Sequence, residues 1–225
     1  MKTTSLFVSL WLATLAFAQQ GGDETTRHNA VIAHGTIMGL AFAFLFPVGA
    51  IVIRTASFRK LPWVHAGIQM FAYILALTGL GLGVYIAIKP QSQLTASNGH
   101  PIIGIIVIGA LLFQPIGGLI HHYKYAHQNK KTFWAPTHVW LGRLFITVGI
   151  INGGLGLMLS GNTVKGEIAY GVIAGVIWCI WVAVSTWSAI STRGAVDETG
   201  EKALGSSVAT SEKGTDRNGE AMIAT

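Results

Sequence analysis

The sequence predicts an all-α integral membrane protein in which five transmembrane helices follow a signal peptide. Two observations carry this prediction. Apolar residues make up 51% of the 225 residues and charged residues only 11%, and the apolar residues form runs long enough to cross about 30 Å of hydrocarbon. The amino-terminal stretch is typical of a secretory signal, because Lys2 precedes an apolar segment that ends in the cleavage pattern Ala16-Phe17-Ala18.

The five predicted helices cover approximately residues 30–53, 62–88, 100–122, 137–160 and 167–190. Pro62 and Pro136 fall at helix starts, where the missing N–H is not needed. Pro47 and Pro115 fall inside apolar runs, which membrane helices tolerate because neighbouring helices satisfy the freed carbonyls.

The chain divides into four expected parts: a signal peptide (1–18), a short extracellular or lumenal segment (19–29), the transmembrane domain (30–190) and a disordered cytosolic tail (191–225). The tail is rich in Gly, Ser, Thr and charge, with few large apolar residues. The single cysteine, Cys179, excludes an intramolecular disulfide framework.

The basic residues indicate how the helices are oriented. The loop after the first helix carries Arg54, Arg59 and Lys60, and the loop after the third carries Lys124, Lys130 and Lys131. Each of the other two loops carries one lysine, Lys89 or Lys165. The positive-inside rule places the loops 54–61 and 123–136 in the cytosol and the N-terminus outside, in a membrane of the secretory pathway such as the plasma, vacuolar or endosomal membrane. The formal net charge of +6 therefore faces lipid headgroups, and no nucleic-acid partner is expected.

Histidines recur at the same place in four helices. His34, His65, His100 and His138 each lie within the first few residues of their helix. Because successive helices run in opposite directions, His34 and His100 are expected near the outer face, and His65 and His138 near the cytosolic face. Ionisable residues inside a membrane are costly and usually functional, and imidazole is a common axial ligand of haem iron.

Zinc and copper are the competing uses of such histidine pairs. The sequence has no Asp or Glu between Glu24 and Glu167, which excludes carboxylate-assisted sites in the membrane. Zinc sites use three or four protein ligands, whereas each face offers one pair, with His121 and His122 as additions on the cytosolic side only. A porphyrin brings four nitrogens and needs two more ligands, so two haems per chain are expected. His122 is the alternative to His138 as a ligand.

A haem also needs room between helices. On the second helix, four small residues lie within about 40° of His65: Ala72, Ala76, Gly79 and Gly83. On the fourth helix, four glycines lie within about 60° of His138: Gly142, Gly149, Gly153 and Gly156. Glycines also occur eighteen residues after His65, His100 and His138, at Gly83, Gly118 and Gly156, and are expected to face the interior at the opposite end. Ordinary small-residue packing between membrane helices is the alternative.

Basic residues near the cytosolic face are candidates for binding anions. Arg143 lies about one and a half turns after His138 with no acid to pair it, so a haem propionate is its expected partner and snorkelling to headgroups the alternative. Arg54, Arg59 and Lys60 are candidate substrate residues for an anionic donor, and simple topology marking is the alternative.

Five segments of the chain resemble the eukaryotic cytochrome b561 family, in the form usually attached to a DOMON domain. They are AHGTIMGLAFAFLFPVGAIVIR (33–54), WVHAGIQ (63–69), QPIGGLIHH (114–122), HVWLGR (138–143) and NGGLGL (152–157). The resemblance covers about residues 28–190. It implies haem b, a four-helix haem-binding core with one peripheral helix, and pairing of His34 with His100 and of His65 with His138. It also implies transmembrane electron transfer from cytosolic ascorbate or a similar reductant.

The chain departs from that family in two places. Only about ten residues separate the predicted signal from the first helix, so no DOMON domain is expected and the outer partner is expected to be another molecule. His100 stands in SNGHP rather than in the serine-leucine-histidine-serine-tryptophan of ascorbate-linked members. The extracellular or lumenal acceptor is therefore left open among a ferric chelate, monodehydroascorbate and a separate redox protein.

The function has two competing interpretations, and the oligomeric state, a homodimer included, is left open. A non-redox small transporter is disfavoured because the predicted membrane segments lack carboxylates that would couple protons or cations. A haem-free structural partner of another oxidoreductase is the other alternative.

Overall fold

The computed structural model describes residues 24–88, 99–128 and 133–191. The predicted signal peptide and cytosolic tail lie outside these residues. Within them all regular secondary structure is helical, and five stretches are long and apolar enough to cross a membrane: Glu24–Thr55, Leu61–Ala87, Gly99–Ile120, Pro136–Leu159 and Val164–Ser191. The predicted fold class, an all-α integral membrane protein, is confirmed.

The first membrane helix consists of three continuous pieces: α2 (Glu24–Gly39), the π-helix η1 (Leu40–Leu45) and α3 (Phe46–Thr55). It begins six residues before the predicted start at residue 30, because polar residues outside the hydrocarbon continue the same helical hydrogen bonding. The π-helix ends two residues before Pro47, and the Phe46 N–H bonds to the Ala41 carbonyl, five residues back. Since proline has no N–H and its ring clashes with the carbonyl four residues earlier, a wider turn relieves the contact.

The third membrane helix is interrupted where one helix was predicted. It consists of α5 (Gly99–Leu111) and α6 (Phe113–Gln128). The break at Leu112 precedes Pro115, which cannot donate a hydrogen bond to the Leu111 carbonyl. The Leu112 N–H donates to the Ile108 carbonyl at 3.2 Å, as in an α-helix, and also to the Gly109 carbonyl at 3.3 Å, which tightens the turn at the break.

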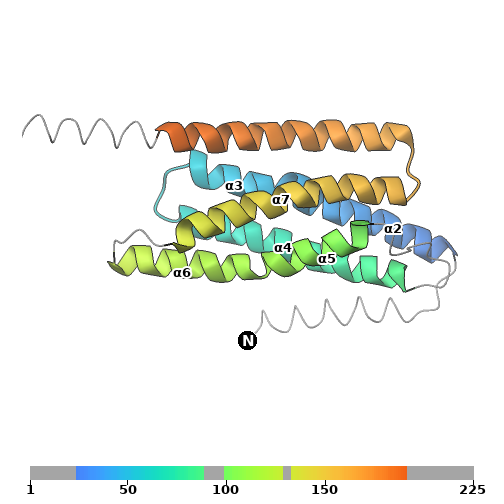
Figure 1. Ribbon diagram of the computed structural model, residues 1–225, viewed down its shortest axis with the longest axis horizontal. Helices are drawn as coiled ribbons and strands as arrows, with labels where there is room; N and C mark the ends of the chain where they lie inside the picture. The colour runs from blue at the N-terminus through green and yellow to red at the C-terminus, as the bar shows by residue number, and fades with distance from the viewer. Residues whose placement is uncertain (1–23, 89–98, 129–132, 192–225) are drawn as a thin grey trace, which may run out of the picture. The chain divides into compact units, whose positions relative to one another are not determined.

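The first four membrane helices form two antiparallel pairs that pack on each other (Figure 1). The first membrane helix packs along α4 (Leu61–Ala87), and α5 and α6 pack along α7 (Trp134–Leu159). Contacts of α4 with α5 and of α2 with α7 join the pairs. This arrangement brings the beginnings of α2 and α5 to one end, which we call the first end, and those of α4 and α7 to the other, the second end.

The interior of the bundle holds small and apolar side chains, including the fully buried Ala41, Ala72 and Ala76. Many large apolar side chains on the membrane helices are instead exposed, for example Phe71, Ile105, Leu144 and Ile173, each more than half exposed. An outward apolar surface of this extent is what a lipid environment requires.

The last helix, Val164–Ser191, is attached to α7 by two hydrogen bonds. The Tyr170 hydroxyl donates to the Ile150 carbonyl at 2.8 Å, and the Trp178 indole N–H donates to Thr147 Oγ1 at 3.1 Å. The Tyr170 hydroxyl also fills the space that a side chain at Gly153 would need.

Candidate functional site

His34 and His100 face each other at the first end. Their ring centroids are 6.0 Å apart and their planes make an angle of 88°. A histidine nitrogen lies about 2 Å from a metal that it binds, and its ring centre lies about 1 Å farther away. Two axial imidazoles on opposite sides of one iron therefore have centroids about 6 Å apart, so the observed separation fits an iron between the two rings.

Backbone carbonyls of the opposite helices hold both rings. His34 Nδ1 donates to the Gly79 carbonyl on α4 at 2.7 Å, and His100 Nδ1 donates to the Asn152 carbonyl on α7 at 2.9 Å. Because a carbonyl only accepts, each bond requires the proton on Nδ1 and leaves the Nε2 lone pair available. The two imidazoles are thus in the tautomer that ligates a metal.

A glycine stands beside each of these carbonyls. Gly83 and Gly156 lie four residues after Gly79 and Asn152, where a helical side chain leans back over the carbonyl of the preceding turn. A Cβ at Gly83 would lie 3.0 Å from His34 Cε1, and one at Gly156 only 2.7 Å from His100 Cε1. The absence of these side chains lets the imidazoles reach the carbonyls.

His65 and His138 at the second end each lie against the preceding membrane helix, His65 through a carbonyl bond and His138 beside a glycine. His65 Nδ1 donates to the Gly49 carbonyl on α3 at 2.8 Å. A Cβ at Gly118 on α6 would lie 3.3 Å from His138 Cε1. All three glycines spaced eighteen residues from a histidine, Gly83, Gly118 and Gly156, thus contact a histidine of another helix. The mutual pairing of His65 with His138 stays a prediction.

Arg54 and Arg143 lie close together at the second end. The positive charge of Arg143 repels that of Arg54, and Arg54 also lies near the ring of His65. The Nε atoms of both arginines are buried and have no hydrogen-bond partner. The Arg143 guanidinium also lies over the Trp140 ring, 5.0 Å from its centroid, a cation–π contact.

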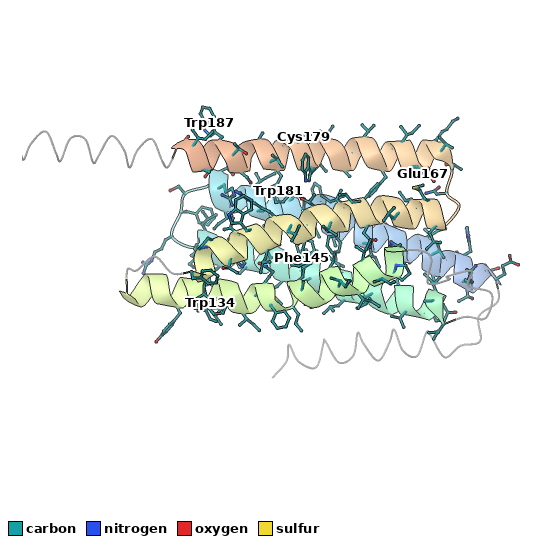
Figure 2. All side chains as sticks on the ribbon, in the orientation of Figure 1. Trp134, Phe145, Glu167, Cys179, Trp181 and Trp187 are labelled. Carbon is teal, nitrogen blue, oxygen red and sulfur yellow. The ribbon has the colours of Figure 1, made fainter. Side chains whose placement is uncertain are left out.

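No protein carboxylate compensates these two charges within the described ranges 24–88, 99–128 and 133–191, where the carboxylates are Glu24 and Glu167. Both belong to the first end, and Figure 2 shows Glu167 at the beginning of the last helix. Two half-buried cations that repel each other favour an anion between or beside them. The arrangement fits carboxylates, which guanidinium groups bind with two parallel hydrogen bonds.

The remaining candidate residues are less enclosed. Arg59 and Lys60 lie in the turn between α3 and α4 and are exposed. His121 and His122 belong to α6, and their side chains lie outside the described part of the structure. The carbonyls of Gly49, Gly79 and Asn152 were not predicted as partners of the histidines. The sequence nevertheless marks two of these carbonyls, because Gly83 and Gly156 follow Gly79 and Asn152 by four residues.

A bundle of membrane helices with two histidines held at an iron-binding separation is the arrangement expected of a membrane-bound cytochrome. The chain belongs to the eukaryotic cytochrome b561 family, whose model matches residues 33–162, a range that includes all four histidines. The predicted family is therefore confirmed. Haem b is the cofactor of this family.

Three curated proteins of Arabidopsis thaliana illustrate the relationship. Two are cytochrome b561 and DOMON domain-containing proteins, 27% and 24% identical over 76% and 77% of this chain and 42% and 43% of their own length. The third is a cytochrome b561 domain-containing protein, 29% identical over 53% of this chain and 47% of its own length. The chain thus spans less than half of each relative's length. No solved structure matches the chain.

Proposed function

We propose that this protein transfers electrons across the membrane through two haem b groups, one held by His34 and His100 and the other by His65 and His138. The observation that carries the proposal is the 6.0 Å separation of the His34 and His100 rings. The glycine contacts of His138 and the carbonyl bond of His65 support an equivalent site at the second end.

The chain's own residues account for the kind of chemistry. A bound haem supplies a one-electron iron centre. With two imidazoles as ligands, each bound haem would have no free position for oxygen, so the histidine pairs favour electron relay over oxygen binding. The carbonyl bonds to Nδ1 orient the rings of His34, His65 and His100.

The direction of transfer follows from the basic residues. Arg54, Arg59 and Lys60 lie at the second end, which the positive-inside rule places in the cytosol. The exposed Arg59 and Lys60 would attract an anionic donor such as ascorbate. Arg54, half-buried beside Arg143, would bind a propionate of the inner haem or the bound donor. Electrons would leave from the His34–His100 haem to an extracellular or lumenal acceptor.

The donor interaction predicts a salt effect. At low ionic strength ascorbate is expected to reduce the haem faster, because charges at the cytosolic face are screened beyond about 10 Å at 0.1 M salt and about 3 Å at 1 M. Lys60→Ala is expected to lower the low-salt rate about two- to tenfold. Stopped-flow absorbance measures the rate. The exposed Lys165, at the first end, supplies the control Lys165→Ala. A rate that responds neither to salt nor to Lys60→Ala would show that these residues only mark topology.

The close approach of His100 to Gly156 predicts a steric effect. In Gly156→Ala the added Cβ meets His100 Cε1 and displaces the ring from the Asn152 carbonyl. The affinity of this pair for haem is expected to fall about 10- to 100-fold, as when a supporting hydrogen bond to a metal ligand is lost. Haem titration of the purified protein measures it.

Gly154→Ala is the matched control, because nothing lies within 4 Å of a Cβ at Gly154 on the same helix. Equal haem affinity in the two variants would contradict the role given to Gly156.

A further inference from the structure

A third arginine, Arg27, lies on the same helical face as His34. It stands seven residues before His34 on α2, which is close to two full turns. The bundle covers this face, because Ala30, between the two residues, is only 2% exposed. Arg27 therefore extends along the covered side of α2, outward from the His34–His100 pair.

The side chain of Arg27 resembles those of Arg54 and Arg143 in its surroundings. It is half-buried, and its Nε is enclosed and has no hydrogen-bond partner. A guanidinium in such a position is stabilised by an anion, and a planar carboxylate matches its two parallel N–H groups. Each end of the bundle thus has at least one half-buried arginine on a helix that carries one of its histidines.

We propose that Arg27 binds a carboxylate at the His34–His100 end. The carboxylate belongs either to a propionate of the haem held by these histidines or to an anionic electron acceptor that reaches this face. This inference rests on the proposed function, since it assigns Arg27 to the site from which electrons leave. The ordinary alternative is an ion pair with Glu24, three residues earlier on the same helix.

The two carboxylate sources predict different effects in Arg27→Gln. If the partner is a propionate, its uncompensated negative charge favours ferric iron, so the midpoint potential of this haem falls. A tenfold change in the ratio of reduced to oxidised haem corresponds to 59 mV for one electron. If the partner is the acceptor, both potentials stay unchanged and the KM for a carboxylate-bearing acceptor rises about tenfold.

The experiment uses the full-length protein with haem bound. Redox titration followed by absorbance gives the two potentials, and the haem of this end is the one missing in His100→Ala. Turnover is measured with ferric citrate and with the cationic ruthenium hexaammine. A lowered potential of this haem, or a raised KM for ferric citrate with ruthenium hexaammine unaffected, supports the proposal. His28→Gln, at the adjacent exposed position, is expected to change neither.

Two results would overturn the proposal. In the first, the wild type binds two haems, but Arg27→Gln has the same two potentials and the same KM as His28→Gln. The proposed function then stands without Arg27. The other is a shift of the potential in Glu24→Gln that is equal in size and opposite in sign to the shift in Arg27→Gln, which would identify Glu24 as the partner. If Arg27→Gln does not accumulate, Arg27→Lys is the variant to test. Lysine keeps the charge but loses the two parallel hydrogen bonds, so a smaller change in the same direction is expected. If Arg27→Lys shows no change, the proposal is overturned. A wild type without haem removes the proposed function as well.

Discussion

His100→Ala is expected to lower the haem content from two per chain to one and to stop transfer to an acceptor on the outer side. The ring of His100 is one of the two that lie 6.0 Å apart, and its loss leaves His34 without an opposite ligand. The second end is untouched, so a donor on the cytosolic side is expected to reduce the remaining haem at close to the wild-type rate. Proteoliposomes with ferric citrate inside or outside measure both steps separately.

The control for this variant is His28→Ala, because His28 is exposed on α2 and is not one of the four predicted ligands. Two haems in His100→Ala would contradict the assignment of His100. Loss of cytosolic reduction in this variant would show that the His34–His100 pair was assigned to the wrong face of the membrane.

His138→Ala is expected to give the opposite pattern. One haem is lost, but it is the one nearest the donor, so reduction from the cytosolic side itself is expected to fail even though the His34–His100 haem is still bound. The reason is distance: the two histidine pairs are expected near opposite faces of a layer about 30 Å thick. Absorbance after adding ascorbate to the cytosolic face of oriented vesicles measures this step.

This variant also tests the pairing at the second end. If His138→Ala still binds two haems, another histidine replaces it, and His122 on α6 is the first to test. The double variant His138→Ala/His122→Ala then separates a substitute ligand from a wrong assignment. Identical behaviour of His100→Ala and His138→Ala would contradict the division of the site into two ends.

The number and type of the membrane helices could be predicted from the sequence because hydrocarbon thickness sets a minimum length that apolar runs report directly. Their ends could not. The first helix extends back to Glu24, since polar residues outside the membrane continue a helix without any change in hydropathy. The sequence also did not show how each proline would distort its helix. Pro47 follows a π-helix, whereas Pro115 follows a break at Leu112.

The position of the histidines was visible in the sequence because helix direction alternates and each histidine stands near a helix start. Their supports were not, because the acceptors are backbone carbonyls, which every residue has. Only the glycines indicate them, since Gly83 and Gly156 leave open the carbonyls of Gly79 and Asn152. The approach of Arg54 to Arg143 depends on how two distant helices pack, which no local pattern encodes.

The central claim, two haems held by two pairs of histidines, is tested most directly by the absorption spectrum and haem content of the purified full-length protein. The account predicts a reduced, low-spin, six-coordinate haem b spectrum with close to two haems per chain. A haem content near zero in well-folded protein would contradict it.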